Sequence, residues 1–312
     1  MIQSLSLSAE ITLALHNLNS EGSEGNQQQT RMVHVIDATG KRHCVNAVSG
    51  DMFKHIYVRH LTEILRAQGE PLSLGAATGS PDRITVDPEF KSAIKGRGAS
   101  EVQTEMLRRC AVTDIAGTLF TEGVTVPRKS CVEFGWVVGI PAKVHTEQYF
   151  HVKYEPERRK IAGQVPRGEG TIAGAQTVFH RPASSGVYAI VCHLELSRVG
   201  VNDVTREAVV AERSRTARQR AAVQALLATL IKPAGAHTNT QNPHVLDCSG
   251  ILTTSRSYLP APMVSPLAEG YREEITSISA TLNKLTPEAV EVRSFTRMAE
   301  GVAFLEMVSA EF

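Results

Sequence analysis

The sequence has few cysteines, and none of them belongs to a paired motif. The five cysteines of the 312-residue chain are Cys44, Cys110, Cys131, Cys192 and Cys248, and no two of them are spaced as in CxxC. An odd and scattered set argues against a disulfide framework and against a zinc knuckle. We therefore expect a reducing, cytoplasmic environment, and no bound metal or cofactor.

Long apolar runs are also missing. No stretch approaches the roughly 18 consecutive apolar residues that predict a membrane span. The N-terminus, MIQSLSLSAEITLALHNL, has no basic start followed by an apolar block, so we expect no signal peptide. A membrane is accordingly not among the expected partners.

The chain has little net charge, but its charges are unevenly spread. The formal net charge is +1, which taken alone argues against a strongly basic nucleic-acid binder. Residues 142–181, however, hold seven Lys and Arg against four Glu, whereas residues 264–312 hold four against eight. A neutral total can therefore conceal a basic surface and an acidic one, which in a self-assembling subunit could meet on neighbouring copies.

The pattern of apolar residues predicts a mixed α+β fold. Period-two alternation over 4–17 predicts a half-buried strand, and the Asp37–Gly40 turn predicts a hairpin over 32–48. A loop between them, an insertion from 70 to 109 and a long polar hairpin over 151–183 are expected from their Gly, Ser and Pro content. Further predictions are a loop-and-strand region after Cys110, a strand over 187–199 and helices over 51–67, 99–109, 206–231 and 270–285. This order is typical of a split βαβ, or ferredoxin-like, core with insertions.

The stretch SGDMFKHIYVRHL, residues 49–61, contains two histidines but does not predict a metal site. At about 100° per residue, His55 and His60 lie about 140° apart around the helix, whereas a helical metal pair needs i,i+4 spacing. His60 falls within the apolar arc, which predicts a hydrogen-bonded core histidine. Ser49, Gly50, Lys54 and His55 begin the helix, where free backbone N–H groups and a cation favour an anion. The alternative is a capped helix whose lysine is only solvated.

Several stretches, in this order along the chain, resemble one family. They are HNLNSEGSEGNQQQTR, VNAVSGDMFKHIYVRHL, CAVTDIAGTLF, RKSCVEFGW, HTEQYFHVKY and GVYAIVCHLELSRVGVN. The combination is similar to DevR-type CRISPR-associated proteins, the backbone subunits that line the guide RNA in type I, Cascade-like effector complexes. The resemblance covers about residues 1–205, and its most specific part is the loop NxEGxEGNxxxxR followed by SGxxxKH.

The resemblance implies a right-hand-shaped protein. It would have an RRM-like palm (residues 1–69, 110–150 and 184–312, with helical additions), a finger-like insertion (70–109) and a β-hairpin thumb (151–183). Copies would stack into a helical filament along CRISPR guide RNA, and each thumb would displace one base from pairing. Target DNA would be recognised by base pairing with the guide, and the other effector-complex subunits would be partners.

The resemblance also implies which residues meet the RNA. In the palm they are Asn17, Asn19, Asn26, Gln27, Arg31, Ser49, Gly50, Lys54, His55 and Arg59. In and beside the thumb they are Lys153, Arg158, Arg159, Lys160 and Arg167, with Ile161, Val165 or Ile172 as the wedge. Only 5% of the residues are aromatic, and there is no RNP-like aromatic pair, which predicts that the protein holds the RNA backbone rather than reading bases.

Enzymatic alternatives have little support in the sequence. Some related backbone subunits cleave target RNA with a thumb-loop aspartate, but residues 155–180 contain no Asp, and Asp51 and Asp114 are isolated. A Cys/His hydrolase built on Cys131 or Cys192 has no nucleophile motif around it. A transcriptional regulator would need a helix-turn-helix signature, which we do not find. We therefore expect a protein that is not an enzyme.

Overall fold

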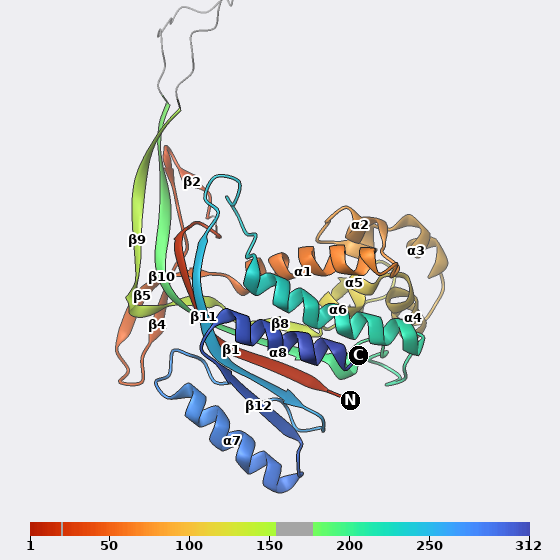
Figure 1. The fold of residues 1–312 in the computed structure, drawn as a ribbon. Coiled ribbons are helices and arrows are strands. Elements are labelled where there is room, and N and C mark those ends of the chain that lie inside the picture. Colours follow the sequence, from red (N-terminus) through yellow and green to blue (C-terminus); the bar gives the residue numbers. More distant parts are fainter. Residues whose placement is uncertain (20, 154–176) are drawn as a thin grey trace, which may run out of the picture.

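The structure is a computed structural model, which describes residues 1–19, 21–153 and 177–312 (Figure 1). The strands are β1 Ser4–His16, β2 Ser23–Glu24, β3 Gln27–Gln28, β4 Met32–Ile36, β5 Arg42–Val48, β6 Thr118–Phe120, β7 Val126–Arg128, β8 Val132–Phe134, β9 Val137–Lys153, β10 Thr177–Glu195, β11 His244–Ser255 and β12 Val290–Phe295. The helices are α1 Gly50–Ala67, α2 Leu74–Ala77, α3 Pro88–Ala93, α4 Ala99–Arg109, α5 Ala111–Ala116, α6 Glu212–Ile231, α7 Tyr271–Leu285 and α8 Met298–Ala310, with 3-10 turns η1 Arg83–Val86 and η2 Leu196–Arg198.

A large, mainly antiparallel sheet organises the chain, and the predicted α+β class is confirmed. Its strand order is β12-β11-β1-β10-β9-β5-β4, and β8 also pairs with β10. The strand predicted over 4–17 is present as β1, but it is buried on both faces rather than on one. The segment after β11 covers the serine face, because the Ser6 hydroxyl donates to the Ala261 carbonyl at 2.9 Å and the Ser4 hydroxyl accepts from the Ala261 amide.

Helices cover both faces of the sheet. α1, α6 and α8 form one layer, and α7 lies on the opposite face (Figure 1). The alternation along β11 explains this arrangement. Leu252 belongs to the main core with α8, whereas its neighbour Ile251 packs with Tyr271 and Ile275 of α7.

β9 and β10 extend beyond the rest of the sheet as a two-stranded arm, defined here as residues 144–153 and 177–186 (Figure 1). A line of irregularities crosses the sheet where the arm begins. Leu15 in β1 and Ala142 in β9 have positive φ angles of 54° and 64°, and the β9–β10 register shifts beside Gly186. A Cβ at Gly186 would lie 2.3 Å from the Lys143 carbonyl oxygen, so only glycine fits there.

Most predicted elements are confirmed, and several predictions were wrong in part. The hairpin β4–β5, the helices α1, α4 and α7, and the Asp37–Gly40 turn are where we expected them. Residues after Cys110 form the buried helix α5 before any strand, and the expected irregular insertion contains α2 and α3. α6 begins at Glu212 rather than at residue 206, because the preceding residues fold back and pair Ala208 with Val201.

A buried carboxylate joins several of these elements. Asp114 of α5 is fully buried, and its side chain pairs with Arg128 at 2.7 Å and with Arg218 of α6 at 2.9 Å. The Gly200 amide donates to both carboxylate oxygens. Arg218 also reaches Glu70, just beyond α1, at 2.7 Å. The aspartate that appears isolated in the sequence is therefore the centre of an ion network.

Replacing this carboxylate should destabilise the protein strongly. In Asp114→Asn, two buried guanidinium groups would lose their shared anion, which typically costs about 3–5 kcal/mol. Urea unfolding followed by circular dichroism measures this loss. Asp82→Asn, at an exposed position in the insertion, is the control and should change stability by about 0.5 kcal/mol or less. A loss below about 1 kcal/mol in Asp114→Asn would contradict the role assigned to Asp114.

A second buried ionisable group lies at the end of β1. The His16 ring contacts Tyr188 edge-on at 4.9 Å, and its Nε2 atom has no hydrogen-bond partner among the described residues. Burial lowers the pKa of His16 from 6.5 to about 4. The folded state therefore excludes a proton that the unfolded chain binds below about pH 6.5.

This difference makes stability depend on pH. The free energy of unfolding should be unaffected by His16 above pH 6.5 and should fall as the pH drops towards 4, by up to about 3 kcal/mol. His16→Phe removes the titrating group while keeping an aromatic ring beside Tyr188. Urea unfolding of both proteins across this pH range should give a flatter curve for the variant. Parallel curves would show that His16 does not contribute.

Candidate nucleic-acid interface

The first turn of α1 is built as predicted. Ser49 is the N-cap, and its hydroxyl accepts from the Met52 amide at 3.2 Å. The Ser49 amide donates to Asn19 Oδ1 at 3.0 Å, which ties the helix start to the loop after β1. Phe53 and Tyr57 face the core, whereas His55 and Arg59 are exposed, as the helical wheel predicts. The N-terminal half of α1 thus presents its basic residues to the surface.

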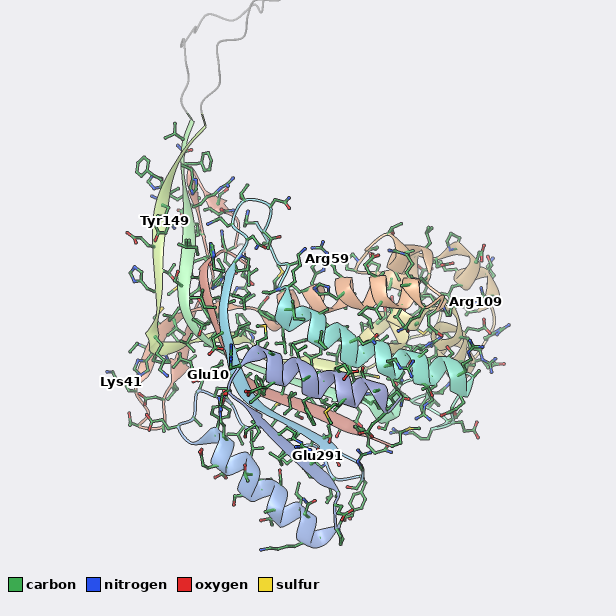
Figure 2. All side chains as sticks on the ribbon, in the orientation of Figure 1. Glu10, Lys41, Arg59, Arg109, Tyr149 and Glu291 are labelled. Carbon is green, nitrogen blue, oxygen red and sulfur yellow. The ribbon has the colours of Figure 1, made fainter. Side chains whose placement is uncertain are left out.

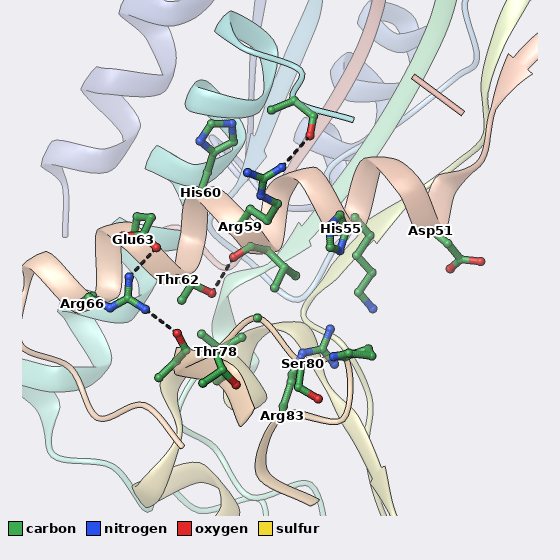
Figure 3. Close-up of a pocket in the computed structure, with 18 of the residues that line it drawn as sticks. Asp51, His55, Arg59, His60, Thr62, Glu63, Arg66, Thr78, Ser80 and Arg83 are labelled. Carbon is green, nitrogen blue, oxygen red and sulfur yellow. Dashed lines mark hydrogen bonds and ion pairs between the residues drawn. The ribbon is translucent and has the colours of Figure 1, made fainter. Parts of the chain in front are cut away.

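A groove of about 830 Å³ runs between α1 and the insertion (Figure 3). One wall is the exposed side of α1, the other is the segment from Ala76 to Arg83, and Lys232 and Ala234 border one end. Arg66 links the two walls, because it donates to the Ala77 carbonyl at 2.8 Å. Figure 3 shows Ser80 and Arg83 facing α1 across the groove.

Basic side chains outnumber acidic ones along this groove. The ionisable residues that line it are Lys54, His55, Arg59, His60, Arg66, Arg83 and Lys232, against Asp51 and Glu63. Glu63 is paired with Arg66 at 2.5 Å, so it neutralises little of the remaining positive charge. Arg59 lies at the solvent edge of α1 (Figure 2) and donates to the Ala234 carbonyl. Such a groove can attract and hold a polyanion.

The cations of the groove disfavour one another. Burial, and then the nearby charge of Arg83, lower the pKa of Lys54. Burial, and then Arg59 and Arg83, lower the pKa of His55. A bound anion would oppose both effects, because it favours the charged forms. The groove is therefore electrostatically prepared for a negatively charged ligand.

Sequence reasoning missed Arg83. It adopts a left-handed backbone conformation (φ 48°), and one of its terminal nitrogens donates to the Gly117 carbonyl at 2.5 Å. Its Nε is buried without a hydrogen-bond partner in the described residues. Only a family alignment or the fold could have brought it to Lys54, because the segment from residue 70 to Arg83 has no clear periodicity.

Gly50 is confined by packing. The sequence places it at a helix start that favours an anion, and a Cβ there would lie 2.7 Å from the Phe134 carbonyl oxygen and 3.1 Å from that of Gly135. Glycine is needed because α1 begins against the end of β8. This close packing fixes the start of α1 and with it the position of Lys54.

Gly50→Ala should therefore destabilise the protein, by about 1–3 kcal/mol, because the added methyl group meets backbone atoms that cannot rotate away. The matched control is Gly98→Ala at the N-cap of α4, where the nearest atom to a new Cβ is a Glu101 oxygen at 3.8 Å. Thermal unfolding of the two variants compares them directly. Equal melting temperatures would contradict this role of Gly50.

Other predicted residues are bound to the protein itself. Asn17 and Asn19 are buried, and their amides donate to Gln28 and to Glu21. Arg31 pairs with Glu21 and lies over the Trp136 ring. These contacts hold the loop after β1 against the start of α1.

His60, Asn26 and Gln27 are more accessible than those asparagines. His60 is half-buried rather than in the core, because it lies at the edge of the apolar arc, where it bonds the Lys232 carbonyl and borders the groove. Asn26 and Gln27 are exposed on the short β2–β3 hairpin beside β10.

The thumb predictions lie largely outside the described residues. This applies to Arg158, Arg159, Lys160 and Arg167, to the wedge candidates Ile161, Val165 and Ile172, and to the side chain of Lys153. The described part of the arm ends in Tyr149 (Figure 2), Phe150 and Val152, which are all exposed.

The buried cysteines lack the properties of catalytic groups. Burial raises the pKa of Cys131 to about 12 and the pKa of Cys192 well above its usual value, so neither thiol is an activated nucleophile. Outside residues 20 and 154–176, no cluster of three or more His, Cys, Asp or Glu side chains is placed to bind a metal. In the same part of the chain, no helix is long and apolar enough to cross a bilayer.

Comparison with known proteins places the chain among CRISPR-associated proteins. A family model described as "CRISPR-associated negative auto-regulator DevR/Csa2" matches residues 7–276. The chain therefore belongs to the DevR/Csa2 family, a Cas7-type family, and the resemblance seen in the sequence is confirmed.

Individual relatives and solved structures are also similar to this chain. The chain is 23% identical over 279 residues to the "CRISPR-associated aCascade subunit Cas7/Csa2 2" of Saccharolobus solfataricus, covering 83% of this chain and 82% of the relative. A chain of a solved "CRISPR RNA-guided surveillance complex, pre-nicking" is similar in fold, with a TM-score of 0.52, 16% identity and 99% of each chain covered. A chain of another such complex aligns with a TM-score of 0.48 and 15% identity, over 99% of each chain.

Proposed function

We propose that this protein is a non-catalytic backbone subunit that binds CRISPR guide RNA, polymerises along it and presents it for base pairing with target DNA. The observation that carries the proposal is the basic groove between α1 and the insertion, which Lys54 and Arg83 line from its two walls. A groove that holds the sugar-phosphate backbone leaves the bases of the guide free to pair.

The strand order supports the palm, finger and thumb interpretation. The series β1, α1, β8, β10, α6 and β11 gives the spatial order β11-β1-β10-β8, which is the connectivity of a ferredoxin-like or RRM-like core. In the proposal, residues 1–69, 110–150 and 184–312 are the palm, 70–109 the finger-like insertion and 151–183 the thumb. The arm of β9 and β10 would be the base of that thumb.

The structure suggests a division of labour among the proposed RNA-binding residues. Lys54, His55, Arg59 and Arg83 would face phosphates, because they line the groove. Asn26 and Gln27 are exposed and suit phosphate or 2′-hydroxyl contacts. Asn17, Asn19, Arg31, Ser49 and Gly50 would act mainly by shaping this surface. Lys153, Arg158, Arg159, Lys160 and Arg167 remain candidates on the thumb, with Ile161, Val165 or Ile172 as its wedge.

The proposed partners are guide RNA, target DNA through the guide, further copies of this chain and other effector-complex subunits. The surveillance complex whose chain shares this fold is described as RNA-guided. A holding role also agrees with the chemistry of Asp114, whose two carboxylate oxygens are both bound to buried donors and cannot reach RNA.

Lys54→Ala tests the proposal. Binding of labelled guide RNA, measured by fluorescence anisotropy over a range of salt concentrations, should weaken about 5–10-fold at low salt. The slope of log affinity against log salt should become shallower by about 0.7, which corresponds to one lost phosphate contact on a single strand. The melting temperature should change little, because Lys54 is not part of the core.

Lys284→Ala is the matched control, since this exposed lysine lies at the end of α7, on the other face of the sheet. It should leave affinity and slope unchanged. A wild-type protein that purifies without RNA and fails to bind guide RNA at low salt would overturn the proposed function. An unchanged slope of log affinity against log salt in Lys54→Ala would show that the groove does not bind the RNA.

A further inference from the structure

A second, smaller pocket lies beside the first turn of α1, and it differs in character from the groove. Its volume is about 290 Å³, and the residues that line it include Ser49, Asp51, Lys54, Lys129, Glu133 and Trp136. Asp51 and Lys54 line the groove as well. Lys54 therefore stands between two adjoining hollows, and a chain bound in the groove can continue past it into the pocket.

Trp136 is the distinctive residue of this pocket. It is the only tryptophan of the chain, it precedes β9, and 45% of its surface is exposed although its neighbour Val137 is fully buried. The Arg31 guanidinium lies 5.1 Å from the ring centre. Arg31 does not line the pocket, whereas Trp136 does. The indole thus packs against the arginine and also contributes an exposed aromatic side chain to the pocket.

The charges of the pocket are nearly balanced. Lys129 is paired with Glu133 at 2.8 Å, and Asp51 offsets Lys54. An uncharged, planar group fits this environment better than a phosphate does. A nucleobase is such a group, and single-stranded RNA is commonly bound by stacking bases on exposed aromatic rings.

We propose that one base of the bound RNA turns past Lys54 and stacks on Trp136, while the adjoining phosphates follow the groove. This inference rests on the proposed function, because it needs the RNA backbone in the groove. It adds a base-binding subsite to a surface that the sequence predicts to hold backbone only. Stacking is sequence-tolerant, since every base has an aromatic face, so the subsite is compatible with guides of any sequence.

The single tryptophan allows a direct test. Titration of wild-type protein with single-stranded guide RNA should quench the emission of Trp136 in step with binding measured by anisotropy. Inorganic polyphosphate, which has the charge but no bases, should bind with little quenching. RNA that binds without quenching, or polyphosphate that quenches as strongly as RNA, would overturn the stacking and leave the groove proposal intact.

Two substitutions give an independent measure. Trp136→Leu should weaken RNA binding about 10-fold, within the range expected for one lost base–aromatic stack. Trp136→Phe keeps an aromatic face and should retain affinity within about 3-fold. Both variants should fold normally, because the side chain is half exposed. Wild-type affinity in Trp136→Leu would overturn the subsite, whereas failure of the wild-type protein to bind any RNA would overturn the proposed function and the subsite together.

Discussion

The shared anion of Asp114 is the interaction on which much of this structure depends. Arg128 and Arg218 are nearly inaccessible to water, and their guanidinium groups approach the same carboxylate from segments 90 positions apart in the chain. Without this carboxylate, the two buried cations would strongly destabilise the folded state. Backbone carbonyls of Leu107, Arg198 and Val201 accept further hydrogen bonds from these guanidinium groups. The network therefore joins several segments of the chain around a buried point.

The ion network adjoins the groove. Asp114 belongs to α5, whose Val112 lines the groove, while Glu70 follows the end of α1 and Arg218 belongs to α6. The network therefore connects α5 and α6 with the end of α1, the helix that forms one wall of the groove. The interior ion pairs are satisfied within the protein, whereas Lys54 and Arg83 at the groove disfavour each other. Charges are therefore balanced in the interior, at Asp114, and left unbalanced in the groove, where a ligand could bind.

Periodicity and capping allowed much of the fold to be predicted. β1 and α1 have clear alternation or helical spacing, and Ser49 is an effective N-cap signal. The second covered face of β1 could not be predicted, because Ser4, Ser6 and Ser8 look solvent-facing until the residues near Ala261 fold over them. α5 was missed because it is short and buried all round, so it has no amphipathic period.

The candidate site was only partly predictable, because part of it is assembled by tertiary packing. Lys54, His55 and Arg59 belong to one helix, so a helical wheel predicts that they are neighbours on its surface. Arg83 and Trp136 reach the same helix start through tertiary packing, and nothing local marks either of them. Gly50 shows a further limit, because nothing local indicates that a side chain there would meet the Phe134 carbonyl oxygen.

The line of irregular residues across the sheet has a mechanical consequence. About ten residues of β9 extend past it, from Val144 to Lys153, which is a length of roughly 33 Å at about 3.3 Å per residue. A rotation of about 10° at Ala142 and Gly186 would therefore displace the far end of that length by about 6 Å. Small changes of backbone geometry where β9 and β10 leave the rest of the sheet are thus amplified at the far end of the arm.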